Sequence, residues 1–265
     1  MLNQMNKMNT EKKQFVFWTG GWDSTYCLIE LSREEKIIQP IYVHDPGRKS
    51  SPLEFDAMRE ITDLLLKKRE TRAIICPTIA VERNDIEKNS EITDAYNRIK
   101  SIDNLGSQYE WLARLALKYP RIAIGADKPN GELGRTGNLV ERNGGKLILS
   151  EGEWVVDKDA SSEDCSLVLG GFSYPIIHTT ELEMKKNVRE WGYEDVMSRI
   201  WFCHKPIKGK ACGFCRPCQI KMGSGMSFLL PASGRMRYRM YKMLVSVFGT
   251  DRAEYAMSRM YPKRQ

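Results

Sequence analysis

The residues best suited to chemistry lie near the N-terminus, in the turn Thr19–Thr25, which reads T-G-G-W-D-S-T. An apolar run over residues 15–18 precedes this turn, and a helical pattern follows it. A strand that passes through two glycines and several hydroxyls into a helix presents backbone N–H groups to one point, which suits a phosphate chain. Glycines permit close backbone approach, and Asp23 can cap the helix. The turn therefore predicts a nucleoside triphosphate site.

The spacing of the turn differs from that of two well-known phosphate loops. A Walker loop needs G-x-x-x-x-G-K-[ST], and a dinucleotide turn needs G-x-G-x-x-G. The run Gly20-Gly21-x-Asp23-Ser24 instead resembles the S-G-G-x-D-S pyrophosphate loop of enzymes that split ATP into AMP and pyrophosphate, with Thr19 in place of the first serine. An ordinary strand–turn–helix connection uses the same turn-forming residues. The motif alone leaves both interpretations open.

Four cysteines have the spacing of a metal site. Cys203, Cys212, Cys215 and Cys218 read C-x8-C-x2-C-x2-C. Four thiolates so placed can surround Zn²⁺ tetrahedrally and leave no open position, so we predict a structural zinc. Two disulfides are the alternative, but seven cysteines and no apolar targeting segment do not suit a secreted framework. His204 adjoins a ligand and could compete, although the four-cysteine set is already complete.

Length, composition and the thiols together predict a soluble cytoplasmic protein. With 265 residues, 42% of them hydrophobic, it can bury one α/β core and a small appendage. No apolar run approaches the length of a membrane span, and the thiols indicate an intracellular setting. A net charge of +7 suits nucleic acid, ATP or an acidic partner alike. No nucleic-acid recognition motif supports the first of these.

The elements that must position these residues alternate between strands and helices. We expect strands at 15–18, 40–44, 72–76 and 121–126, helices at 53–67 and 108–118, a hairpin at 146–149 and 154–156, and a last strand at 167–169 or 175–177. This order predicts an α/β fold, a doubly wound, Rossmann-like parallel sheet with a small C-terminal zinc-binding helical region. The expected division is a loose tail over 1–12, an ATP-binding domain over 13–200 and the zinc region over 201–265.

The order of the motifs resembles the 7-cyano-7-deazaguanine synthase family across nearly the whole chain. The matching features are the N-terminal loop, the Gly125-Ala126-Asp127 segment after a middle strand, a helix-forming stretch over 175–191 and the four cysteines. Members use ATP to adenylate 7-carboxy-7-deazaguanine, then form an amide and, with a second ATP, a nitrile. The resemblance implies ATP, Mg²⁺ and Zn²⁺ as cofactors and a deazaguanine-type substrate.

The same resemblance implies the site residues. Those expected to bind ATP are Thr19, Gly20, Gly21, Trp22, Asp23, Ser24, Thr25, Val43, His44, Gly106 and Gly125, and those expected to act in catalysis are Asp23, Ser24 and Asp127. In a doubly wound sheet these segments meet at the carboxyl ends of the strands.

Several positions depart from the family pattern. Ser107-Gln108 replaces an Arg-Asn pair, the segment 128–135 replaces an aspartate- and tyrosine-rich base pocket, and Glu181 stands at the usual lysine. The half that makes AMP is thus better preserved than the half that selects substrate. This favours an enzyme that transfers the acyl group to a protein amine, because some family members in bacterial antiphage operons resemble such conjugating enzymes. An ordinary synthase using ammonia and a subunit that has lost chemistry are the alternatives, and the intact turn disfavours the latter.

A C-terminal helical segment, Arg235–Val247, carries two stripes. Arg235, Arg239 and Lys242 form a basic stripe beside an apolar one of Met236, Met240, Met243 and Val247. Packing in the core or in a homodimer is the simplest interpretation of the apolar stripe. Methionine also suits adaptable docking surfaces, which would fit an acidic protein partner.

Overall fold

The computed structural model describes residues 13–48, 50–129 and 138–261. The expected tail over 1–12 lies outside these ranges, as does most of the substrate-side segment 128–135. Within them, none of the helices is long and apolar enough to cross a membrane.

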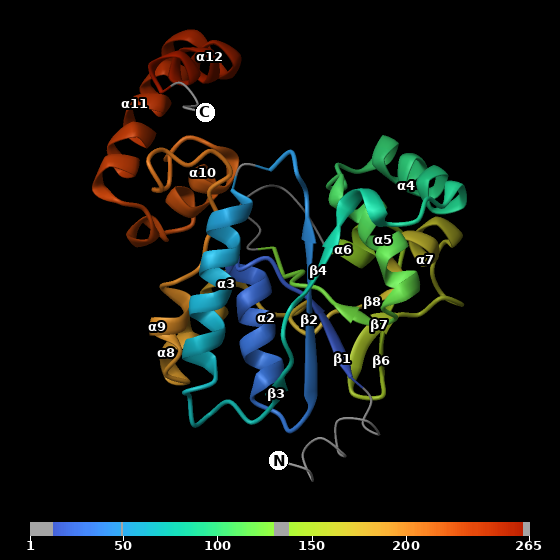
Figure 1. Cartoon of the computed structure of the whole chain (residues 1–265). Coiled ribbons are helices and arrows are strands. Elements are labelled where there is room, and N and C mark those ends of the chain that lie inside the picture. Colours follow the sequence, from blue (N-terminus) through green and yellow to red (C-terminus); the bar gives the residue numbers. More distant parts are fainter. Residues whose placement is uncertain (1–12, 49, 130–137, 262–265) are drawn as a thin grey trace.

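A single mixed sheet forms the centre of the molecule, with the strand order β3-β2-β1-β5-β8-β7-β6 and β4 paired to β2 (Figure 1). The strands are β1 (Gln14–Phe17), β2 (Ile37–His44), β3 (Ile74–Ile75), β4 (Ile79–Glu82), β5 (Ile122–Ala123), β6 (Leu147–Ser150), β7 (Glu153–Val156) and β8 (Phe172–Ser173). All pairings from β3 across to β8 are parallel, whereas β6–β7 and β7–β8 are antiparallel. The antiparallel edge is the expected hairpin, joined to the sheet through β8.

Helices cover both faces of the sheet and bury a separate apolar cluster on each. One face carries α2 (Trp22–Ser32), α3 (Ser51–Leu65), α8 (Glu181–Glu190) and α9 (Glu194–Met197); the other carries α4 (Ser90–Ile102), α5 (Gln108–Lys118), α6 (Leu139–Arg142) and α7 (Glu163–Leu169). Strand β2 is buried along nearly its whole length, as a central parallel strand must be. The predicted α/β class is therefore confirmed, with a sheet that is mostly rather than wholly parallel.

Both predicted positions of the last strand, 167–169 and 175–177, were wrong. Residues 167–169 belong to helix α7, because the Ser162 side chain caps that helix by accepting a hydrogen bond from the Cys165 N–H at 3.3 Å. Residues 175–177 form a turn, and the strand itself is the short β8. A run of three apolar residues could not distinguish a buried helix from a buried strand.

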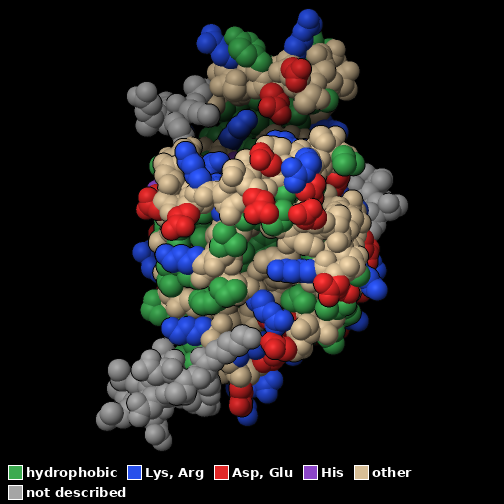
Figure 2. Space-filling view, turned by 90° about the vertical axis from the view of Figure 1, so that its right-hand side faces the viewer, with side chains coloured by type: hydrophobic (Ala, Val, Ile, Leu, Met, Phe, Trp, Pro, Cys, Tyr) green, Lys and Arg blue, Asp and Glu red, His purple; other side chains and the backbone are tan. Residues whose placement is uncertain are grey.

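The C-terminal region consists of helices around the four cysteines. It contains α10 (Arg216–Gly223), the short 3₁₀ turn η2 (Ser227–Leu229), α11 (Ala232–Phe248) and α12 (Thr250–Met260), and it buries its own apolar cluster, to which the cysteines belong. Figure 2 shows its outermost helices as a lobe above the α/β body, with Lys and Arg side chains at the waist between them. The carboxyl ends of the parallel strands point towards this region in Figure 1.

Candidate nucleotide and metal sites

The glycine turn connects the central strand β1 to helix α2. Gly20 has a φ of +68°, a conformation that favours glycine, and a Cβ there would lie 3.1 Å from the Met58 side chain. Gly21 is the N-cap residue of α2 and no side chain caps the helix, so the prediction that Asp23 caps it was wrong: Asp23 lies inside the first turn. The Thr19 and Ser24 hydroxyls lie 3.2 Å apart, and the Thr19 N–H donates to Ser24 Oγ at 3.3 Å. The turn thus places two hydroxyls beside the open N-terminus of an 11-residue helix.

A second strand end packs directly against this turn. Gly125 follows β5, and a Cβ there would lie 2.8 Å from the Asp23 carbonyl carbon and the Ser24 nitrogen, closer than real Cβ contacts come. From β1 the chain continues to β2, its neighbour on one side in the sheet, whereas its neighbour on the other side is β5. The strand order therefore reverses between β1 and β5. Open α/β sheets bind ligands in the crevice at such a point, beyond the carboxyl ends of the strands.

A cavity of about 1700 Å³ opens at this crevice and extends to the C-terminal region. Its lining is rich in cations: Arg48 and Arg83 come from the α/β body, and Lys205, Lys208, Lys210 and Arg237 come from the C-terminal region. Two carboxylates, Asp23 and Asp45, also line it. Ligand pockets usually measure about 300–1,000 Å³, so the cavity has room for a nucleotide and a second molecule, and its charge suits anions.

The predicted ATP-binding residues divide into two groups. Those that line the cavity are Thr19, Gly21, Trp22, Asp23, Ser24, Val43 and Gly125. Those outside the lining are Gly20, Thr25, His44, Gly106 and the predicted catalytic Asp127. The hydroxyl of Thr25 is buried and accepts a hydrogen bond from Trp18 Nε1 at 3.1 Å, and the His44 ring contacts Glu82 at 2.9 Å. Gly106 does not line the cavity, but the next two residues, Ser107 and Gln108, do. The ligand roles of both groups remain predictions.

The carboxyls behind the turn are electrostatically linked. Burial, and next the Asp23 charge, raise the pKa of Asp127 to about 7. Burial likewise raises the pKa of Asp23, whereas the charge of Lys221 lowers it. Tyr109, on helix α5, has its pKa raised to about 12 by burial and then by the charge of Asp127. These three groups therefore share one weakly solvated region at the base of the crevice.

Lys221 is a site residue that the sequence patterns did not single out. Its ammonium lies 2.5 Å from the Glu181 carboxylate, and the two side chains are only 8% and 12% exposed. It also lies 5.4 Å from the centre of the Trp22 ring. The sequence could have pointed to Lys221 only through its position three residues after Cys218. A helix that starts at the cysteines places residues 218 and 221 on the same face, one turn apart. Glu181 stands where the family pattern has a lysine, and in the structure Lys221 lies directly beside it.

Other cations reach the cavity from the segment between the first two cysteines. Residues Ile207 and Lys210 exchange two backbone hydrogen bonds of 2.9 and 3.1 Å, which closes a two-residue hairpin with Lys208 and Gly209 at positive φ. His204 lies 3.2 Å from the Arg48 guanidinium. Burial and the charge of Arg48 lower the pKa of His204, so the imidazole is kept neutral more readily.

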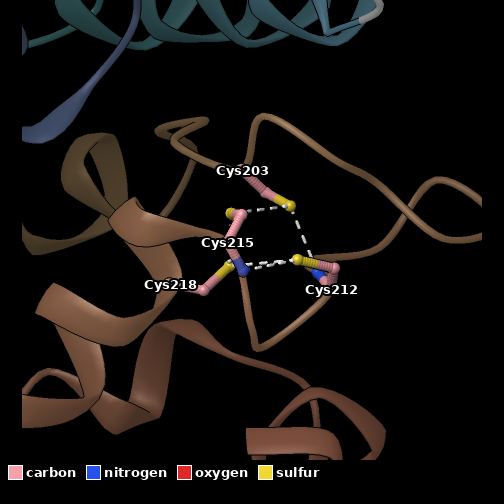
Figure 3. A group of neighbouring side chains, drawn as sticks. All are labelled: Cys203, Cys212, Cys215 and Cys218. Atoms are coloured by element: carbon pink, nitrogen blue, oxygen red, sulfur yellow. Dashed lines mark hydrogen bonds between the residues drawn. The ribbon is translucent and has the colours of Figure 1, made fainter. Parts of the chain in front are cut away.

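The four cysteines form a compact, buried cluster (Figure 3). Their sulfur atoms all lie within 4.8 Å of one another, and the pairs Cys203–Cys215 and Cys212–Cys218 are separated by 3.8 and 3.9 Å. A tetrahedral site with Zn–S bonds of about 2.3 Å needs sulfurs about 3.8 Å apart. Backbone N–H groups of Cys212 and Cys215 also point at cluster sulfurs at 3.2 Å. The donor set and its spacing fit one four-coordinate zinc.

The apolar stripe of α11 lies mostly on the surface. Met236, Met243 and Val247 are 66%, 61% and 66% exposed, whereas Met240 is partly buried against the C-terminal cluster. Packing within this chain's core therefore explains Met240 alone, and that interpretation was wrong for the other three. Arg237 faces inwards and donates to the backbone carbonyls of Ala211 and Cys212 at 3.0 and 2.7 Å, which ties α11 to the cysteine loop.

No model of a known protein family matches the chain, and no curated protein sequence matches it either.

Proposed function

We propose that the chain is an ATP-dependent ligase that adenylates a carboxylate of the 7-carboxy-7-deazaguanine type, releases pyrophosphate and transfers the acyl group to an amine. The observation that carries this proposal is the turn from β1 to α2, with Gly125 pressed against its backbone at the strand-order reversal and a cation-lined cavity in front. The likeness of the turn and the cysteine spacing to the 7-cyano-7-deazaguanine synthase family supplies the substrate class.

The proposed reaction has two steps. A carboxylate oxygen of the substrate attacks the α-phosphorus of ATP, the bond from this phosphorus to the bridging oxygen breaks, and pyrophosphate leaves. The α2 N-terminus and the Thr19 and Ser24 hydroxyls favour the negative charge of the phosphates. An amine then attacks the acyl carbon, loses a proton to solvent, and AMP departs. Mg²⁺, when bound with the nucleotide, would offset charge on the phosphates, and Asp23 is the carboxylate of the turn that lines the cavity and would hold it.

The role of zinc in this proposal is structural. Four thiolates leave no coordination position for water or substrate. The metal would instead hold the segment that carries Lys205, Lys208 and Lys210 against the cavity.

A protein amine is our proposed acceptor, and ammonia is the alternative. The size and the open, basic lining of the cavity support a bulky acceptor, and the exposed basic and apolar stripes of α11 support an acidic docking partner. The amine can be identified by supplying ATP, Mg²⁺, the carboxylate and ammonium without any protein partner. Efficient release of free amide or nitrile would establish the ordinary synthase activity and refute the protein acceptor.

The adenylation step is tested by exchange of labelled pyrophosphate into ATP. Exchange should require 7-carboxy-7-deazaguanine, and it should be lost in Asp23→Ala and in Ser24→Ala. The matched control is Ser246→Ala on the exposed side of α11, which should exchange normally. Normal exchange in both turn variants would show that ATP reacts elsewhere.

A further inference from the structure

The charged groups behind the glycine turn form one cluster contributed by four elements. Asp23 belongs to α2, Asp127 follows β5, Glu181 opens α8 and Lys221 lies on α10. Each of the two aspartates feels the charges of both Glu181 and Lys221. The uncharged but titratable Tyr109 of α5 faces the same two aspartates. The cluster therefore has three carboxyl groups and one ammonium.

This composition matters because the proposed ligand is a polyanion. In their ionised forms Asp23 and Asp127 would oppose phosphates at the turn, and a third carboxylate would add to that repulsion. The Lys221 ammonium neutralises Glu181 through the 2.5 Å pair and also acts on both aspartates. The pair is almost fully removed from water, so solvent screens its field less than it would at the surface.

The position of Lys221 is fixed from two sides. Helix α10 starts at its N-cap residue Cys215 and includes Cys218, one turn before Lys221. The chain leading into the cluster is attached to the turn, because the Trp201 N–H donates to the Gly20 carbonyl at 2.8 Å. The cysteine cluster and the glycine turn are thereby held in one arrangement, with the lysine between them.

We propose that Lys221 is an electrostatic positioning residue of the nucleotide site: held by the four-cysteine region, it offsets the charge of Glu181 behind the glycine turn so that a polyphosphate can bind in front. It lies outside the cavity lining and does not touch the ligand. This inference rests on the proposed nucleotide function. It adds Lys221 to the nucleotide site and gives the four-cysteine region the role of holding that lysine in place.

The test compares ligands of the same shape and decreasing charge. Affinities for ATP, ADP, AMP and adenosine are measured by calorimetry in the wild type, Lys221→Met, Glu181→Gln and the double variant. Lys221→Met should weaken ATP binding about tenfold, ADP and AMP progressively less, and adenosine not at all, since the loss follows the ligand charge. Glu181→Gln should strengthen ATP binding, and the double variant should return close to the wild type because the pair is removed as a neutral unit.

The control is a matched surface pair on α8, Lys186 with Glu190, whose side chains are exposed. Lys186→Met should leave all four affinities unchanged. If Lys221→Met does not fold, Glu181→Gln and the double variant still decide the matter. Equal losses for ATP and adenosine, or no change in any variant, would overturn the inference while leaving the nucleotide site intact. A wild type that does not prefer ATP over adenosine would overturn the nucleotide site itself, and the inference with it.

Discussion

The glycine turn and the four-cysteine region both line the same cavity, but they are built in different ways. The turn is made by backbone: Gly20 at positive φ, Gly125 within contact of the Asp23–Ser24 peptide, and the start of helix α2. The cysteine region is made by side chains, namely four clustered cysteines and the lysines of its hairpin. A site made by backbone is rigid as soon as the sheet folds, whereas one made by four thiolates depends on a metal. The two regions should therefore fail in different ways.

The largest effect is expected from breaking the cysteine cluster. Cys215→Ser should lower the zinc content from one per chain and reduce the melting temperature, because the binding energy of a structural zinc is folding energy. Elemental analysis and thermal melting measure both quantities. Cys76→Ser, a buried cysteine far from the cluster in sequence, is the control and should retain zinc. Protein purified without chelators and found free of zinc would contradict the metal assignment.

The next largest effect should come from the backbone side. Gly125→Ala places a methyl group 2.8 Å from the turn, which should cost about 1–3 kcal/mol of stability through overpacking and abolish pyrophosphate exchange while zinc is retained. Gly223→Ala is the control, because a Cβ there meets nothing within 4 Å. Full exchange activity in Gly125→Ala would mean that close approach of β5 to the turn is not needed.

A smaller effect concerns pH. The Asp127 pKa is raised from 3.8 to about 7, so between these values the folded protein holds a proton that the unfolded chain releases. Stability from this group is present in full below about pH 4 and is lost as the pH rises through about 7. Asp127→Asn should therefore melt a few degrees above the wild type at pH 8 and alike at pH 4. The control, Asp159→Asn at an exposed position, should melt like the wild type at both pH values. If Asp127→Asn also melts like the wild type at both pH values, the raised pKa of Asp127 is contradicted.

The smallest effect on folding is expected on the exposed face of α11. Met243→Glu should change stability by less than about 0.5 kcal/mol, because the side chain is mostly in water. If this face docks an acidic protein, as we propose, the variant should abolish that docking in a pull-down. The same variant tests the predicted homodimer: sedimentation should show unchanged mass if the face docks another protein, and a shift from dimer to monomer would assign the face to self-association.

The comparison also shows which features the sequence could predict. The turn, the helix over 108–118, the hairpin and the cysteine cluster are local patterns whose geometry follows from a few neighbouring residues, and each appears in the structure near its expected bounds. The two-residue strands β3, β5 and β8 depend on pairing with distant segments, so their lengths and, for β8, its position could not be read from the chain.

The missed parts of the site have the same origin. Lys221 and Glu181 are 40 residues apart in sequence, and nothing in either segment indicates that they meet. Arg48 and Arg83 likewise join the cavity only through the order of the strands that precede them. Charge pairs between distant segments leave no periodic pattern in the sequence. A cation that is missing at one position can therefore be supplied by a residue that is distant in sequence and near in space.

In the proposed reaction a carboxylate attacks the α-phosphorus of ATP at the glycine turn, and transfer of an oxygen isotope would report this attack. The substrate is 7-carboxy-7-deazaguanine with ¹⁸O in both carboxylate oxygens, incubated with ATP, Mg²⁺ and an amine acceptor. We predict AMP that carries one ¹⁸O, since the attacking oxygen stays on phosphorus when the amine displaces AMP, and unlabelled pyrophosphate. Unlabelled AMP, or ADP and labelled phosphate in place of AMP and pyrophosphate, would contradict it.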